Sequence, residues 1–283
     1  MAFYLGVDGG GTNCRAAIAD GDGVILGRGE AGSANIMTDP EKSRVNILAA
    51  ADAALRAAGL DASFGDLDAV LGLAGANVPA AARRMERDLP FASSRLESDV
   101  VIAVKGALGA EDGIVSLLGT GSVFAAQEEG IVRTVGGWGF RLSDLGGGAR
   151  LGQAVLEAAL LAHDGLRPRS ALLDALVIEA KGPERLIIFA HSASPADYAA
   201  LVPRIFGAAA MGDGAAIEVI AKARDDIAAA IDLLSMEGDP PICFVGGVGR
   251  LFAEQLARRY GARIREPKGT ALDGALAMAR GLV

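Results

Sequence analysis

Asp8 stands at the end of an apolar run, FYLGV, and is followed by three glycines, a threonine and an asparagine. The backbone N–H groups of such a turn, with the Thr12 hydroxyl, form a concave nest of the kind that binds phosphate. A carboxylate at the strand end is placed to hold Mg²⁺, directly or through water. We therefore expect Asp8 at the metal; a plain glycine hairpin is the alternative. The residues expected to contact the nucleotide phosphates are Gly10, Gly11, Thr12 and Asn13.

Two common nucleotide motifs do not fit this turn. A dinucleotide fingerprint needs G-x-G-x-x-G at the start of a helix, whereas Cys14 replaces the last glycine here and the following residues alternate like a strand. A Walker loop is excluded because no Gly-Lys-Ser/Thr follows. The pattern predicts a phosphate-binding hairpin between two strands.

Two further glycine turns follow strand-like segments, GTGS at 119–122 and FVGGVG at 244–249. The first adds hydroxyl and backbone donors for phosphate oxygens or a sugar, from Thr120, Gly121 and Ser122. The second is a strand-to-helix junction, where a base and ribose can lie against the backbone of Gly246, Gly247 and Gly249. Three such turns in one chain indicate nucleotide binding far more strongly than any one of them.

The elements that must position these turns repeat along the chain. Residues 4–18 and 113–127 both follow the pattern strand, glycine turn, strand. The first unit reads β-β-β-α-β-α-β-α, the part from 150 to 235 is mostly helical, and 240–261 is a strand, a glycine turn and a helix. The repetition predicts an α/β chain of two halves with a ligand cleft between them and a hinge near residues 100–110.

Composition narrows the class of protein. The 283 residues suffice for two domains, and 51% hydrophobic with 5% aromatic residues predicts aliphatic, helix-rich cores. The apolar runs are too short for a membrane span, and the N-terminus lacks a signal pattern, so we expect a cytoplasmic protein. A net charge of −8 without a Lys/Arg block argues against nucleic acid. Cys14 and Cys243 are expected to be buried and to form no metal site.

Seven segments in order resemble the N-acetylglucosamine kinase and bacterial glucosamine kinase family, within the superfamily of sugar kinases, heat-shock chaperones and actin. They are DGGGTNCRA, LGLAGA, the SD before VVIAVKGALGAEDG, LLGTGS, GGWGFRLSDLGGGARLG, FVGGVG and ALDGALAMA. The resemblance covers essentially the whole chain, is weakest from about 165 to 210, and is closest to the glucosamine kinase branch in GSANIM and LLAHDGLRP.

That resemblance implies two ribonuclease-H-like, actin-like ATPase domains, each with a mixed five-stranded sheet flanked by helices. They would span 1–105 and 106–269. The residues of the last stretch, TALDGALAMARGLV, predict a helix over 270–283 that is capped by Thr270 or Asp273, and we expect it to pack back on the first domain.

The same resemblance implies roles for single residues. Asp99 matches the family's catalytic aspartate, the base, although it could also cap the helix after it. Asn35 matches the sugar-binding asparagine, and is otherwise a turn residue. Further sugar contacts fall to the GGWGF segment, where a lone tryptophan is more often core packing, and to the SDLGGG segment. The residues concerned are Gly137, Trp138, Gly139 and Asp144, with Ser122 as a sugar contact from the second turn.

One departure from the family pattern bears on substrate choice. Many relatives have an acidic residue after the aspartate that matches Asp144, where this chain has Leu145. The implied activity is an ATP- and Mg²⁺-dependent kinase acting on the 6-hydroxyl of glucosamine, with N-acetylglucosamine as the alternative substrate. Ranked below it are an ATPase activator of acyl-CoA reductases or dehydratases, for which two cysteines supply no cluster, and a non-catalytic sugar sensor. The expected partners are an amino sugar, ATP and, optionally, a second copy of the chain, but no nucleic acid or membrane.

Overall fold

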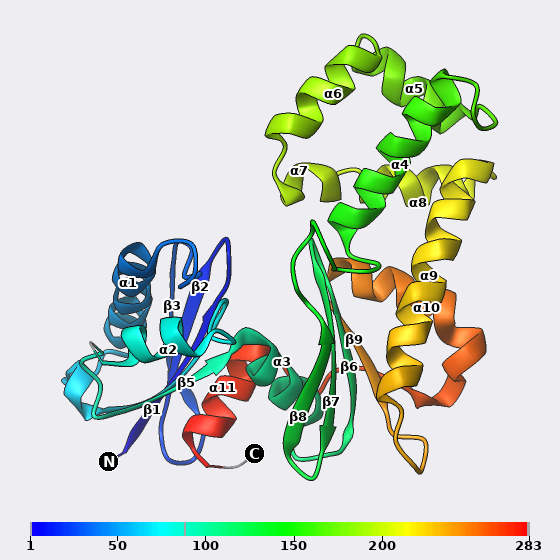
Figure 1. Cartoon of the computed structure of the whole chain (residues 1–283). Helices are drawn as coiled ribbons and strands as arrows, with labels where there is room; N and C mark the ends of the chain where they lie inside the picture. Colours follow the sequence, from blue (N-terminus) through cyan, green and yellow to red (C-terminus); the bar gives the residue numbers. More distant parts are fainter. Residues whose placement is uncertain (1, 88, 282–283) are drawn as a thin grey trace. The chain divides into compact units, whose positions relative to one another are not determined.

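The computed structural model of the chain describes residues 2–87 and 89–281, which divide into two compact units (Figure 1). The first unit combines residues 1–113, 127–132 and 266–283, and the second combines 114–126 and 133–265. The boundary expected after residue 105 falls inside helix α3 (Asp99–Leu108), and that boundary stays a prediction. Residues 282–283 of the expected last helix lie outside the described residues.

Each unit is built on one five-stranded sheet. The first contains β1 (Phe3–Gly9), β2 (Cys14–Ala19), β3 (Ile25–Ala31), β4 (Leu67–Leu73) and β5 (Ser93–Ser98), in the order β3-β2-β1-β4-β5. The second contains β6 (Gly113–Leu118), β7 (Ser122–Glu128), β8 (Ile131–Gly136), β9 (Ile242–Val245) and β10 (Ile264–Arg265), in the order β10-β9-β6-β7-β8. Both sheets therefore place their third, second, first, fourth and fifth strands side by side, which confirms the predicted duplication of two five-stranded mixed sheets.

One face of the first sheet is covered by α1 (Pro40–Ala58). The Asp39 side chain caps its first turn by accepting from the Lys42 N–H, and Gly59 ends it in the left-handed region at φ 63°. Glycines in β3 let the helix lie directly on the strand, because a Cβ at Gly29 would lie 2.1 Å from the Ala50 carbonyl oxygen. Two short elements flank β4 in the sequence, η1 (Phe64–Asp66) before it and α2 (Pro79–Glu86) after it.

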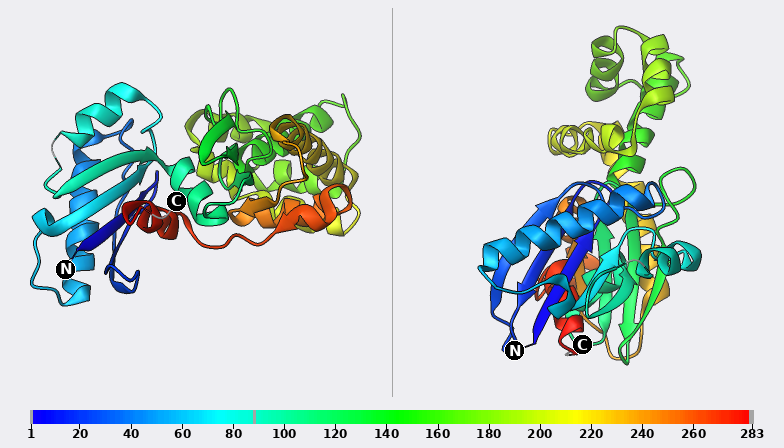
Figure 2. Two further views of the ribbon diagram at one scale, coloured as in Figure 1. Left: turned by 90° about the horizontal axis from the view of Figure 1, so that it is seen from below. Right: turned by 90° about the vertical axis from the view of Figure 1, so that its left-hand side faces the viewer.

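The opposite face carries α3 and the last helix, α11 (Ala271–Ala279), which lie side by side (Figures 1 and 2). Their backbones meet at two glycines: a Cβ at Gly106 would lie 1.9 Å from the Thr270 carbonyl oxygen, and one at Gly274 would lie 2.0 Å from that of Ile102. The predicted cap of α11 is confirmed, since Thr270 and Asp273 form a capping box.

The second unit is dominated by helices, as the sequence predicts for 150–235. They are α4 (Gly148–His163), α5 (Ala171–Glu179), α6 (Pro183–Ser192), α7 (Pro195–Ala199), α8 (Val202–Ala210), α9 (Gly214–Leu234), α10 (Gly247–Tyr260) and η2 (Gly261–Arg263). α4 leads away from the second sheet to α5 and α6, and α9 returns to it (Figure 1). The core of the second unit is mostly aliphatic, and Phe252 of α10 is fully buried in it against Phe206.

Both cysteines are buried, as expected from their apolar surroundings. Within residues 2–87 and 89–281, no single helix has the length and apolar character needed to cross a membrane, although the bent pair 195–210 and 214–234 passes that test of length and composition when taken together.

Candidate active site

The first predicted phosphate turn is a tight hairpin between β1 and β2. The Gly10 N–H donates to the Asn13 carbonyl at 2.9 Å, which closes the turn. Within the described part of the chain, the N–H groups of Gly11, Thr12 and Asn13 have no acceptor, and all three residues are exposed. They line, with Asp8 and Gly10, a hollow of about 240 Å³. The hairpin thus offers several uncommitted donors to one anion.

Asp8 ends β1 on the rim of that hollow and is half-buried. Burial raises the pKa of Asp8, the nearby Arg15 guanidinium lowers it, and the charge of Asp99 raises it. The carboxylates of Asp8 and Asp99 are therefore close enough to influence each other. The same surroundings make Cys14 unreactive, because burial and the Asp8 charge raise the pKa of its thiol to about 12.

Asp99 is the first residue of α3, immediately after β5. The helix is capped by Ser98, whose hydroxyl accepts from the Val101 N–H at 3.3 Å, so the reading of Asp99 as the N-cap is wrong. The Asp99 carboxylate instead accepts from the Val100 N–H at 3.0 Å. Burial raises the pKa of Asp99, while the N–H groups of Val100 and of Asp99 itself lower it. A half-buried carboxylate fixed by a helix start is suited to accept a proton.

Asn35 lies on a segment tied to the phosphate hairpin. The Ala34 N–H donates to the Gly10 carbonyl at 2.9 Å, and the Ile36 N–H donates to Ala74 at 3.0 Å. The Asn35 Oδ1 accepts from the N–H groups of Met37 and Thr38. Its side-chain oxygen therefore holds the turn, and within residues 2–87 and 89–281 the Nδ2 amide has no recorded hydrogen-bond partner.

In the second unit, the GTGS turn joins β6 to β7 and meets the start of α4. The N–H groups of Gly148 and Ala149 donate to the carbonyls of Gly119 and Thr120 at 2.8 and 2.9 Å. Thr120 is exposed, whereas the buried Ser122 donates its hydroxyl to the Leu145 carbonyl at 2.8 Å. Thr120 is thus accessible to a ligand, while the Ser122 hydroxyl proton is committed to the loop.

Asp144 sits in that loop as a buried carboxylate in the left-handed region, at φ 60°. Its Oδ1 accepts from the Gly139 N–H at 3.1 Å. A Cβ at Gly121 would lie 2.6 Å from its Oδ2, so only glycine lets the carboxylate approach the GTGS turn this closely. Burial raises the pKa of Asp144, and the Gly139 N–H and the Arg150 charge lower it. The loop thus positions a carboxylate beside the second phosphate turn.

Trp138 projects from the same loop with 78% of its surface exposed. Its exposed neighbours Gly137 and Gly139 have φ of 73° and 95°. The alternative that this tryptophan packs in the core is wrong. An exposed indole beside a buried carboxylate matches what a hexose requires, an apolar wall and a polar group.

The third turn begins α10. Gly246, at φ 95°, lies against the strand before the GTGS turn, because a Cβ there would be 2.4 Å from the Leu118 carbonyl oxygen. Gly246 and Gly247 are exposed, and Gly249 is buried against Phe244. The structure therefore brings the two predicted nucleotide turns of the second unit together.

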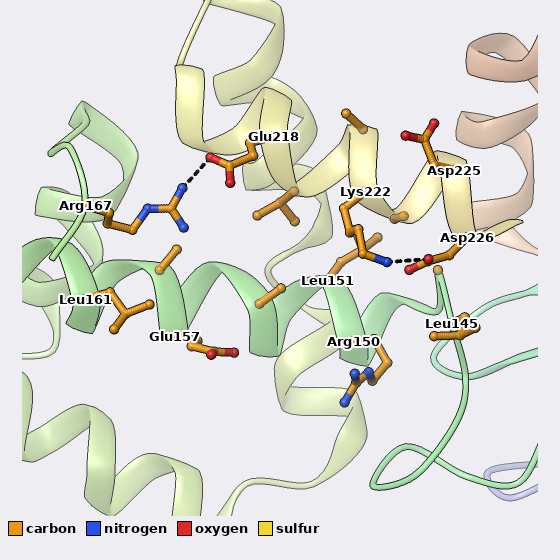
Figure 3. A pocket seen from close by; sticks show the side chains of 16 residues that line it. Leu145, Arg150, Leu151, Glu157, Leu161, Arg167, Glu218, Lys222, Asp225 and Asp226 are labelled. Atoms are coloured by element: carbon orange, nitrogen blue, oxygen red, sulfur yellow. Dashed lines mark hydrogen bonds and ion pairs between the residues drawn. The ribbon is translucent and has the colours of Figure 1, made fainter.

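A larger cavity, of about 610 Å³, lies between α4 and α9 (Figure 3). Its floor is aliphatic, and its charged groups include the ion pairs Arg167–Glu218 and Lys222–Asp226. Of the predicted site, it shares only the loop at Leu145. This cavity lacks the glycine turns, so we do not place the nucleotide in it.

A model of the BadF/BadG/BcrA/BcrD ATPase family matches residues 5–279. The chain belongs to this family. The chain is 34% identical to glucosamine kinase GspK of Vibrio cholerae, over 99% of this chain and 96% of that one. It is 25% identical to the N-acetylmuramic acid/N-acetylglucosamine kinase of Clostridium acetobutylicum, over 87% and 85% of the two chains. The solved structure of a candidate N-acetylglucosamine kinase from Chromobacterium violaceum superposes with a TM-score of 0.90 at 31% identity, covering 99% of both chains.

Two charged residues, one in each unit, lie beside predicted groups but were not among the residues predicted from the sequence. Arg15 lines the phosphate hollow, and Arg150 lies near enough to Asp144 to lower its pKa. Strand alternation could have found Arg15, because an antiparallel hairpin pairs it with Asp8. No comparable signal in the sequence marks Arg150, because its effect on the pKa of Asp144 depends on α4 beginning beside that residue.

Proposed function

We propose that this member of the BadF/BadG/BcrA/BcrD ATPase family is an ATP-dependent hexosamine kinase that phosphorylates the 6-hydroxyl of glucosamine. The observation that carries the proposal is the half-buried Asp99 carboxylate at the start of α3, electrostatically coupled to Asp8 beside an open phosphate hairpin. The full-length similarity to a glucosamine kinase supports the choice of sugar.

In this proposal each unit supplies a different part of the reaction. The first unit provides Asp99 as the base that accepts the proton of the attacking hydroxyl, with Asn35 as a donor to the sugar. The second provides Asp144 and Trp138 for the sugar and Thr120 for the phosphates. Phosphoryl transfer depends on positioning and charge neutralisation more than on covalent chemistry. Fixed carboxylates and glycine turns are what such a reaction needs.

The residues present fit a magnesium nucleotide. Mg²⁺ is held through one or two carboxylates together with waters and substrate phosphates, so it needs no cage of protein ligands. Asp8 supplies a carboxylate on the rim of a hollow whose N–H groups lack acceptors among the described residues. When bound, the ion would neutralise phosphate charge. We assign Asp8 to the metal, and Gly11, Thr12 and Asn13 to the phosphates.

An ATPase that activates another enzyme through an iron–sulfur cluster fits the structure less well. Such a cluster needs accessible thiolates. Cys14 and Cys243 are both buried, in different units, and the pKa of Cys14 is raised to about 12. Neither thiol is placed to ligate a cluster shared with another subunit.

A coupled ADP-release assay with glucosamine, N-acetylglucosamine and glucose tests the proposal. We expect the highest kcat/KM with glucosamine, and a loss of about 10²-fold or more in kcat for Asp99→Asn. Asp61→Asn, at an exposed aspartate of the same unit, is the matched control and should keep wild-type turnover. Absence of ADP release with every sugar would overturn the kinase, and full turnover by Asp99→Asn would overturn the base.

A further inference from the structure

One stripe of α4 stays partly accessible along most of the helix. Apart from His163 at the end of the helix, the residues of α4 that are not buried are Arg150, Gln153, Ala154, Glu157, Leu160 and Leu161. Their spacing of three and four residues places them on one face of the helix. The same spacing forms the seam between two packed helices, so the stripe has the pattern of a surface that meets another helix.

A hollow lies on each side of this stripe. The cavity of about 610 Å³ between α4 and α9 follows one side. A second hollow, of about 390 Å³, lies on the side of α6 and α7, and Leu186, Ile187 and Tyr198 contribute to its lining. Glu157 lines both hollows. Both linings are largely apolar, so the side chains of a helix laid along the stripe would replace water there with apolar contacts.

The two charged side chains of the stripe, Arg150 and Glu157, lie on the same side of α4 (Figure 3). The Arg150 Nη1 donates to the Gln153 Oε1 at 2.9 Å. Neither charged side chain forms an ion pair within the ranges 2–87 and 89–281, whereas the two ion pairs across and along α9 in the same cavity are formed. Seven residues separate Arg150 from Glu157, or about 10 Å along the helix axis, which is too far for them to pair with each other.

A second copy of the chain has the matching charges. In an antiparallel pair of identical helices, Arg150 opposite Glu157 of the partner subunit also places Glu157 opposite the partner subunit's Arg150. The two-fold axis then passes between Gln153 and Ala154, where the small alanine lets the helices approach closely. Leu161 then faces the loop before the partner's helix. A parallel pair would instead bring like charges together.

We propose that the chain forms a homodimer through this stripe of α4, with the two helices antiparallel and an Arg150–Glu157 ion pair on each side of the two-fold axis. Each chain has a net charge of −8, which opposes association. The exchange of opposite charges therefore selects which surfaces meet and in which direction. This inference goes beyond the proposed kinase activity and does not depend on it.

Sedimentation equilibrium of the full chain, without nucleotide or sugar, tests the interface. We expect the wild type at twice the chain mass of 28.7 kDa. Glu157→Arg and Arg150→Glu each bring like charges together, so each should raise the dissociation constant of the dimer about tenfold or more. Arg150→Glu combined with Glu157→Arg makes the charges opposite again and should restore the dimer, which local damage to α4 would not do.

Glu254→Arg is the matched control, because Glu254 is an exposed residue of α10, a helix that lines neither hollow. It should keep the dissociation constant of the wild type. A wild type that sediments as a single chain up to about 100 µM would overturn the proposal. Single variants that dimerise like the wild type would also overturn it, as would a double variant that stays dissociated. Because the measurement needs no substrate, a dimer that phosphorylates no hexosamine refutes only the proposed function, and an active monomer refutes only the interface.

Discussion

Replacing Gly274 with alanine tests whether the contact between α3 and α11 positions Asp99, the proposed base. The two helices meet at glycine, and a Cβ at Gly274 would lie 2.0 Å from the Ile102 carbonyl oxygen and 2.4 Å from the Gly106 nitrogen. Both partners are backbone atoms, so no side-chain rotation relieves the contact. The helices must separate, and α3 carries Asp99 at its start.

The size of the effect follows from this geometry. Restoring an ordinary contact of 3.4 Å requires a separation of about 1.4 Å. Overpacking of this kind costs about 1–3 kcal/mol in the free energy of unfolding, offset by the gain of about 0.5–1 kcal/mol when alanine replaces a helical glycine. We expect a net loss of about 1 kcal/mol, within the range of about 0–2.5 kcal/mol that these two effects span. A shift of about 1 Å at a catalytic group can cost about 10²-fold in rate, so kcat should fall about tenfold or more.

The assay is urea unfolding together with steady-state kinetics. Gly207→Ala is the matched control, because Gly207 lies in α8 with no atom near its missing Cβ. That variant should be unchanged or more stable by up to about 1 kcal/mol, with wild-type kcat. If Gly274→Ala were as stable and as active as Gly207→Ala, the helix contact would not position Asp99.

Three further predictions concern the site itself. Because burial raises the pKa of Asp99, the charged carboxylate destabilises the folded chain near pH 7. Asp99→Asn should therefore raise the melting temperature at pH 7 while removing turnover, and the gain in melting temperature should vanish as the pH falls toward 3.8. A lower melting temperature of the variant at pH 7 would contradict the raised pKa. Trp138 is the chain's only tryptophan and is 78% exposed, so Trp138→Ala should change the unfolding free energy by less than about 0.5 kcal/mol and raise the KM for the sugar. The tryptophan fluorescence of the wild type should change on titration with glucosamine. Unaltered emission at saturation would exclude a contact between Trp138 and the sugar. A Cβ at Gly121 would lie 2.6 Å from the Asp144 Oδ2, so Gly121→Ala should displace that carboxylate. We expect kcat/KM for the sugar, measured by substrate titration, to fall about tenfold or more. A wild-type kcat/KM in this variant would mean that Asp144 need not approach the GTGS turn.

The repeated fold was predictable because its signals are local. Strand alternation and glycine turns recur in both halves, and each depends only on neighbouring residues. The pairing of α3 with α11 also has a cause in the sequence, the glycines at 106 and 274. Their contact joins segments about 170 residues apart, however, and no periodicity within either helix shows which glycine meets which backbone.

The details of the site depend on features that single residues do not show. Ser98 and Asp99 are both good N-caps, and only the point where β5 ends decides that Ser98 takes the position. Trp138 resembles a core residue by type, but a loop of left-handed glycines exposes it. Arg15 gains its meaning from register, because its partner across the hairpin is Asp8. The roles of these residues remain predictions until the variants are measured.

The place of α11 has a consequence for how the chain is made. One face of the first sheet, with Ala17, Ala19 and Val70, is closed by α11, which follows the whole second unit in the sequence. At about 5–20 residues per second, synthesis leaves that apolar face uncovered for on the order of tens of seconds after β1 has emerged. The first unit can therefore complete its core only after residues 271–279 have been synthesised, so its folding must wait until the whole second unit has emerged.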